Sequence, residues 1–361
     1  MSAKRINEIK SGLKKENLDG FIVTHLDHVR YLCGYTGSNG LLVIGNGKTQ
    51  FLTDFRYADQ AKNQVKGATV NVMSKGDLIG ALKEFPQLNR KNLRYGYSES
   101  NLSVAGGKRL QAALPDALLV PGDAMIAELG WVKEKLEIDL IAKACKIGDT
   151  ALERVLQLVA PGVTERELQA ELEYQMAMLG SERPSFETII ASGYRSAMPH
   201  GMASNKKIQA GDFVTFDFGA TVNGYVSDMT RTIVVGKATA KQKKIYGIVL
   251  RSQMAGVKTV KAGVVCRKVD EACRKIITRA GYGKEFGHGT GHGIGFPYNP
   301  IHTGPHVSPI SEEKLQVNNV ITVEPGIYIS GWGGVRIEDD VVVTRNGCKV
   351  LTHFPKNLLE V

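Results

Sequence analysis

The sequence lacks long hydrophobic runs. Its apolar stretches cover only a few residues, whereas a membrane-spanning helix needs about 20. The N-terminus, MSAKRINEIK, is charged and lacks the apolar segment of a secretory signal. Cysteine is scarce, with 5 residues and no CxxC pair, a pattern typical of reduced thiols in a cytoplasm. The sequence therefore predicts a cytoplasmic protein with no membrane partner.

Charge of one sign is not concentrated in any segment. The chain has 46 basic and 36 acidic residues, a formal net charge of +10. Residues 1–125 carry 17 basic and 11 acidic side chains, and the remainder carries 29 and 25. A nucleic-acid-binding arm would appear as a local basic excess with interleaved aromatic residues. We therefore expect a solvated surface and no nucleic-acid partner.

The composition is that of an ordinary globular protein, with 43% hydrophobic, 23% charged and 7% aromatic residues. At about 100–200 residues per domain, a chain of 361 residues favours two domains. A strand followed by breakers at 118–123 precedes a helix-rich segment of different texture, so we predict domains at 1–125 and 126–361. In the first domain we expect a helix, a strand and a hairpin at 4–17, 20–23, 41–44 and 50–53.

Two stretches of the second domain have the same helical frame. Each opens at a Gly-Val pair and closes at a glycine, over 162–180 and 263–281, with an offset of 101 residues. Thr164 and Glu167 have the spacing of a capping box, which supports the first helix start. A duplicated α/β domain explains this echo, and a chance match of two common helix frames is the alternative.

A hairpin in the second domain brings two carboxylates together. A strand pattern over 213–220 is followed by an Asn-Gly turn signal at 223–224. With a two-residue turn, Asp217 faces Thr230, and Asp228 lies on the same sheet face as Asp217. The two acids are then diagonal neighbours, about 7–8 Å apart at Cα. Two like charges inside a strand pair are costly without a cation between them, so we predict a cation site here.

Three further residues with metal-ligand side chains follow in strand or turn contexts: His292, Glu324 and Glu338. Five glycines within 287–295 forbid a stable helix, so His288 and His292 are not a helical zinc pair. These glycines are expected to let the backbone approach a ligand closely. Four carboxylates and one imidazole suit a pair of divalent ions such as Mn, Co, Fe or Zn.

Read in order with their local contexts, the five candidate ligands resemble the dinuclear site of the pita-bread metallopeptidases, which include methionine aminopeptidase, aminopeptidase P and prolidase. These ligands are Asp217, Asp228, His292, Glu324 and Glu338.

The N-terminal third extends the resemblance. Its segments 30–32 (RYL) and 53–57 (TDFRY) resemble the creatinase/prolidase N-terminal domain, which plain methionine aminopeptidases lack. The resemblance implies an α/β fold in which a creatinase-like domain precedes a duplicated, pseudo-two-fold pita-bread catalytic domain. It also implies a homodimer and a substrate peptide with proline at its second position.

Substrate-side histidines are implied by the same resemblance. The segment 196–201, which contains His200, resembles the family's Pro-His-Gly motif. The family usually has a second histidine seven residues after the ligand histidine, but Asn299 stands there in this chain. His302 fits that role if three residues are inserted, and His306 is its competitor.

The implied reaction is hydrolysis of an Xaa-Pro bond by a water activated between two divalent cations, with Mn favoured. Glu324 would be both a ligand and the proton carrier, because a general acid/base must reach the water and the leaving nitrogen. His200 and His302 would donate to the carbonyl oxygen. His288 and Arg336 would contact the ligands without binding metal, and Arg336 would hold a ligand carboxylate in place.

Two other functions fit the fold. One is a non-catalytic pita-bread scaffold that binds RNA or a protein, and the other is a creatinase-like C–N hydrolase that works without metal. Both are disfavoured because all five ligand positions carry ligand-type residues. The sequence leaves open the choice between dipeptidase and aminopeptidase P, the native metal and the preferred N-terminal residue.

Overall fold

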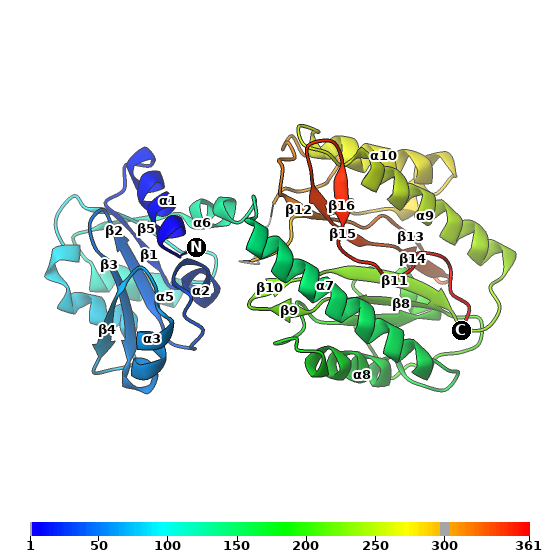
Figure 1. Ribbon diagram of the computed structural model, residues 1–361, viewed down its shortest axis with the longest axis horizontal. Helices are drawn as coiled ribbons and strands as arrows, with labels where there is room; N and C mark the ends of the chain where they lie inside the picture. The colour runs from blue at the N-terminus through cyan, green and yellow to red at the C-terminus, as the bar shows by residue number, and fades with distance from the viewer. Residues whose placement is uncertain (1, 297–303) are drawn as a thin grey trace. The chain divides into compact units, whose positions relative to one another are not determined.

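The structure is a computed structural model that describes residues 2–296 and 304–361. It divides into two compact units, of which the first reaches Gly130 and the second begins at Trp131. Figure 1 labels the helices and strands of both units. No helix within the described ranges is both long enough and apolar enough to cross a bilayer.

The first unit is built on one six-stranded sheet with the strand order β4-β3-β2-β1-β5-β6. The predicted hairpin is confirmed, because β2 and β3 pair antiparallel with Leu41 opposite Leu52. Strand β1 pairs antiparallel with β2 and parallel with β5. The strands are β1 (Gly20–Val23), β2 (Leu41–Gly45), β3 (Thr49–Asp54), β4 (Thr69–Met73), β5 (Arg94–Tyr97) and β6 (Leu118–Pro121).

Helices pack against this sheet through apolar side chains. The expected N-terminal helix is present as α1, which buries Ile6, Ile9 and Leu13 at helical spacing. Another cluster joins Leu82 and Leu110 to buried residues of β1, β2 and β3. The helices are α1 (Ser2–Lys15), α2 (Leu26–Cys33), α3 (Ala58–Gln64), α4 (Leu78–Ala81), α5 (Val104–Ala113) and α6 (Asp123–Leu129).

Within residues 131–296 and 304–361, the second unit contains two helix pairs and four small sheets. In Figure 1, α7 and α8 are drawn on the opposite side of the strands from α9 and α10. Each pair has its own core, in which α7 and α8 pack on β8 and β11, and α9 and α10 pack on β12 to β15. The helices are α7 (Lys135–Val155), α8 (Glu165–Met178), α9 (Ala240–Thr259) and α10 (Cys266–Arg279).

The strands of the second unit form short antiparallel ladders with the orders β11-β8-β7, β12-β15-β16, β10-β9 and β13-β14. Their bounds are β7 (Ile189–Ser192), β8 (Phe213–Phe218), β9 (Thr221–Val222), β10 (Tyr225–Val226), β11 (Met229–Val234), β12 (Val320–Val323), β13 (Gly326–Ile329), β14 (Gly333–Arg336), β15 (Asp339–Val343) and β16 (Cys348–Val350).

Helices α8 and α10 reproduce the predicted 101-residue offset. Both contain 14 residues, and both their first and last residues differ by 101 positions. The glycine that follows each helix, Gly180 or Gly281, has a positive φ, which closes the helix without the strain of a Cβ. Thr164 caps α8 with the predicted box, whereas Val265 at the same place before α10 has no side-chain cap.

The β8–β11 hairpin has the predicted register. Asp217 faces Thr230 in the ladder. Asn223 and Gly224 both have positive φ, 50° and 82°, as a tight two-residue hairpin turn requires. The turn therefore sets which side chains of β8 and β11 share a face.

Candidate metal centre and active site

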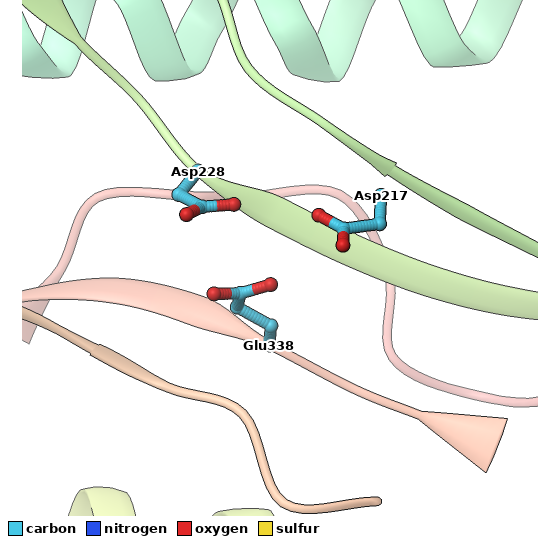
Figure 2. A group of neighbouring side chains, drawn as sticks. All are labelled: Asp217, Asp228 and Glu338. Carbon is cyan, nitrogen blue, oxygen red and sulfur yellow. The ribbon is translucent and has the colours of Figure 1, made fainter. Parts of the chain in front are cut away.

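Three carboxylates from separate parts of the second unit meet at one point (Figure 2). Asp217 lies near the end of β8, Asp228 directly precedes β11, and Glu338 follows β14. One oxygen from each lies within 4.8 Å of the others. The three residues are only 9%, 7% and 2% exposed, respectively, so water screens their mutual repulsion poorly.

The electrostatics of this cluster favour a bound cation. Burial, followed by the nearby carboxylates, raises the pKa of Asp228 and that of Glu338 well above their ordinary values. Oδ1 of Asp228 is buried and has no hydrogen-bond partner among the residues that the structure describes. An unpaired buried carboxylate oxygen is costly unless something positive meets it. Oxygen ligands of this kind fit a divalent ion such as Mn.

Backbone hydrogen bonds fix two of these carboxylates. Oδ2 of Asp340 accepts the N–H of Asp228 at 2.9 Å. The N–H of Glu338 donates to the Thr230 carbonyl at 3.2 Å, and the Thr230 hydroxyl donates to Oε2 of Glu338 at 2.6 Å. The hairpin therefore positions Glu338 as well as its own two acids.

His292 and Glu324 complete the predicted set of five. Nε2 of His292 lies 3.6 Å from Oδ2 of Asp228 and 3.7 Å from Oε1 of Glu324. Nδ1 lies 2.9 Å from the Gly293 carbonyl oxygen, which can only accept, so Nδ1 carries the proton of a neutral ring. The Nε2 lone pair is then left facing carboxylates, the arrangement of a metal-binding imidazole.

The glycines around His292 approach other backbone segments, and no ligand is needed to explain them. A Cβ on Gly291 would collide with the Thr322 carbonyl, and one on Gly293 would collide with the Gly304 carbonyl. Isolated β-bridges join Gly291 to Val307 and Gly293 to Ile321. The expected close approach is therefore present, but it is an approach to protein backbone that seats His292.

Arg336 lies beside this cluster and links several of its parts. Its Nη2 donates to Oδ2 of Asp217, and its Nε donates to the Thr230 hydroxyl at 2.9 Å. Nη1 donates to the Tyr328 hydroxyl at 2.9 Å and to the Pro199 carbonyl at 3.3 Å. Arg336 thus contacts the carboxylate of Asp217, one of the candidate ligands.

Tyr328 is a site residue that the sequence analysis missed. Its hydroxyl lies 2.9 Å from Nε2 of His288. The β13–β14 ladder pairs Tyr328 with Gly334, two residues from Arg336. The glycines and small residues at 330–334 signalled that turn, and a predicted register across it would have placed Tyr328 beside Arg336.

One cavity of ≈ 570 Å³ gathers the predicted residues. It has an apolar wall from Phe186, Ile189 and Pro199. His302 lies outside the residues that the structure describes, whereas its competitor His306 lines the cavity. The other predicted residues on its wall are His200, Asp217, Asp228, His288, His292, Glu324, Arg336 and Glu338.

Burial governs proton affinity along the cavity wall. It lowers the pKa of His288 to about 4, so this imidazole is neutral near pH 7. Burial also raises the pKa of Glu324, with the nearby Asp217 carboxylate adding to the effect and His292 opposing it. Both shifts disfavour the charged form of the side chain, as burial away from water does.

Comparison with known families gives two matches. Residues 139–345 match the description "Metallopeptidase family M24", and residues 5–129 match "Creatinase/Prolidase N-terminal domain". The first match covers more than half of the chain and includes all five candidate ligands.

Relatives and solved structures extend over nearly the whole chain. A curated Xaa-Pro dipeptidase of Pyrococcus horikoshii is 37% identical over 359 residues, covering 99% of both chains. The structure of an Xaa-Pro dipeptidase from Bacillus anthracis superposes with a TM-score of 0.94 at 40% identity, covering 100% of both chains. An X-Pro aminopeptidase from Thermotoga maritima superposes with a TM-score of 0.87 at 36% identity, covering 96% of this chain and 98% of that one.

Proposed function

Because the chain belongs to metallopeptidase family M24, we propose that it hydrolyses the bond between an N-terminal residue and a following proline. The matches confirm the predicted fold, a creatinase-like N-terminal domain followed by a pita-bread catalytic domain. The observation that carries the proposal is the convergence of three buried carboxylates with His292 and Glu324 in one cavity. Neither the scaffold nor the metal-free hydrolase requires this convergence.

We assign the cations to the five predicted ligands. Two divalent ions, with Mn favoured over Co, Zn or Fe, would be held by Asp217, Asp228, His292, Glu324 and Glu338. When bound, they supply the Lewis acidity that activates water and polarises a carbonyl. Support comes from the orphaned Oδ1 of Asp228 and from the Nε2 lone pair of His292.

Proton transfer is assigned to Glu324. Its position on the cavity wall, with Oε1 3.7 Å from Nε2 of His292, suits it to take a proton from the attacking water and deliver it to the proline nitrogen. His200 would donate to the scissile carbonyl oxygen, with His302 as the second donor. His288 would support the site without binding substrate, because both of its ring nitrogens already contact protein groups.

The proposed substrate is a peptide with proline at its second position, either an Xaa-Pro dipeptide or a longer peptide that begins with Xaa-Pro. An Xaa-Pro bond lacks the N–H that ordinary peptidases bind, and its ring fixes φ near −65°. The apolar wall of Phe186, Ile189 and Pro199 gives such a ring or an apolar N-terminal side chain a surface to pack on. The name of the P. horikoshii relative favours the dipeptide as the first substrate. We further propose that the protein is cytoplasmic and forms a homodimer, and sedimentation would test the dimer.

The deciding experiment follows release of the N-terminal amino acid from an Xaa-Pro dipeptide and a matched Xaa-Pro-Yaa tripeptide, with Mn-loaded protein. Cleavage of the dipeptide alone would make this a dipeptidase, and cleavage of the tripeptide an aminopeptidase. The control is the same pair of peptides with alanine in place of proline. Cleavage of the alanine peptides alone would contradict the proposal, and fewer than about one bound cation per chain would favour the scaffold.

A further inference from the structure

An ion pair on α10 between a buried aspartate and a partly buried arginine contacts the glycine-rich segment. Nε and Nη2 of Arg274 donate to Oδ2 and Oδ1 of Asp270, both at 2.8 Å. Asp270 is only 1% exposed, and its side chain also accepts the Thr290 hydroxyl at 2.9 Å. The carboxylate therefore accepts two hydrogen bonds from the guanidinium and one from a hydroxyl, and these compensate for its burial.

The same arginine also holds the backbone of the segment. Nη1 of Arg274 donates to the Phe286 carbonyl at 2.8 Å, and Nη2 donates to the His288 carbonyl at 2.7 Å. The guanidinium lies 4.1 Å from the centre of the Phe286 ring. One planar fork thus fixes two carbonyls and one aromatic ring, a geometry that lysine cannot reproduce.

From Thr290 the contacts continue to the candidate site. The Thr290 carbonyl accepts the N–H of Glu324 at 2.7 Å. The Thr322 hydroxyl accepts the N–H of His292 at 3.1 Å and lies 3.4 Å from Oε1 of Glu324. Because the segment is rich in glycine and has no helix or strand of its own, its backbone dihedrals depend on such external contacts.

We propose that Asp270 and Arg274 are positioning residues of the active site: they set the backbone that carries His288 and His292 and, through Thr290, that of Glu324. This inference rests on the proposed function for its kinetic effect but not for its effect on metal binding. Neither residue lines the cavity, so both act through the segment between 286 and 292.

The alternative is an ordinary ion pair between neighbouring turns that only stabilises its helix. Helix α10 provides a matched control in Lys268–Glu271, an ion pair at 2.7 Å whose side chains are 56% and 59% exposed. Such exposed pairs contribute little to stability. If Asp270–Arg274 were a helix-stabilising pair of the same kind, removing either pair would affect stability alone.

The kinetic test compares R274K, T290V and T290S with the K268A/E271A control. R274K keeps the charge but loses the fork, and T290V removes only the hydroxyl that binds Asp270. We expect kcat to fall about 10–100-fold in R274K and T290V, the usual range for groups that orient metal ligands, with KM nearly unchanged. T290S, which restores the hydroxyl, should recover most of the activity, and K268A/E271A should match wild type.

Metal titration of the same variants gives a readout that does not need turnover. Calorimetric titration of metal-free protein with Mn²⁺ should show about 10–100-fold weaker binding in R274K and T290V, and near-normal binding in T290S. Lower melting temperatures with unchanged kcat and Mn²⁺ affinity would overturn the inference. If wild-type protein cleaves no Xaa-Pro peptide, the proposed function fails, and the titration still decides the role of the two residues.

Discussion

The Tyr328 hydroxyl oxygen lies 2.9 Å from Nε2 of His288, and this contact has a defined direction. Nδ1 of His288 lies 2.7 Å from the Gly289 carbonyl oxygen, which can only accept, so Nδ1 carries the proton of the neutral ring. Tyr328 must then donate to Nε2. Its oxygen in turn accepts from Nη1 of Arg336. The four groups form a directed chain from Arg336 to the backbone of the glycine-rich segment.

Replacing Tyr328 by phenylalanine should interrupt this chain at its centre. Y328F leaves Nε2 of His288 without its donor and one N–H of Arg336 without its acceptor, both in a partly buried setting. The expected loss of stability is about 1–3 kcal/mol, with a fall in kcat of about tenfold as Arg336 loses one of its fixed partners. Urea unfolding and steady-state kinetics on an Xaa-Pro dipeptide measure the two effects.

The control for this change is Y174F, because Tyr174 lies on α8 and is 56% exposed. We expect Y174F to match wild type in both measurements. A Y328F protein with wild-type kcat would show that this chain of hydrogen bonds has no part in the reaction.

Lys133 should give the protein an unusual pH dependence of stability. Burial lowers the pKa of its ammonium group from 10.5 to about 8, with Glu137 opposing the shift. Between these values the unfolded chain binds a proton that the folded chain has released, so stability rises with pH in this window. The buried charge costs stability at pH 7, and its relief amounts to about 3 kcal/mol at about 1.4 kcal/mol per pKa unit.

The test compares wild type with K133M in urea unfolding at pH 7 and at pH 10. K133M carries no buried charge, so its stability advantage over wild type should be largest at pH 7 and shrink by about 3 kcal/mol by pH 10. A difference between the two proteins that stays constant with pH would contradict the buried ammonium.

Local patterns were sufficient to predict the elements that depend on short-range geometry. The Asn223-Gly224 turn fixed the register that places Asp217 opposite Thr230, since a two-residue turn allows only one pairing. The capping box at Thr164 and the glycines at 180 and 281 likewise marked helix ends through backbone geometry.

Contacts between distant segments could not be predicted in the same way. Tyr328 meets His288, and Arg274 meets the His288 carbonyl, only because separate ladders and α10 pack together. No residue spacing encodes that packing. The order of the five candidate ligands was informative only through its resemblance to a family, which does not describe the residues behind the ligands.

Breaking the buried ion pair next to Glu338 should strongly destabilise the second unit. Nη2 of Arg231 donates to Oδ1 of Asp339 at 2.8 Å, and both side chains are almost completely buried. Arg231 also donates to the carbonyls of Glu338 and Phe354. Lys356 binds the other carboxylate oxygen at 2.5 Å. Removing the carboxylate would leave one fully buried cation and one largely buried cation without their shared partner.

D339A is therefore expected to lower the free energy of unfolding by about 3–5 kcal/mol. The matched control is D139A, which breaks the Lys135–Asp139 pair, 2.7 Å apart with side chains 87% and 55% exposed. That variant should lose less than about 1 kcal/mol. Similar losses in the two variants, measured by urea unfolding, would contradict the special role given to burial.

The effect of removing one candidate ligand on stability should reverse its sign when metal is added. In metal-free protein, Asp228 stands among like charges, which together with burial raise its pKa, so D228N should be as stable as wild type or more stable. With Mn²⁺ at 100 times its dissociation constant, binding adds about 2.7 kcal/mol to wild type. D228N binds the ion less tightly and gains less. Thermal unfolding in EDTA and in Mn²⁺ should therefore reverse the stability order of the two proteins, and an unchanged order would remove Asp228 from the metal site.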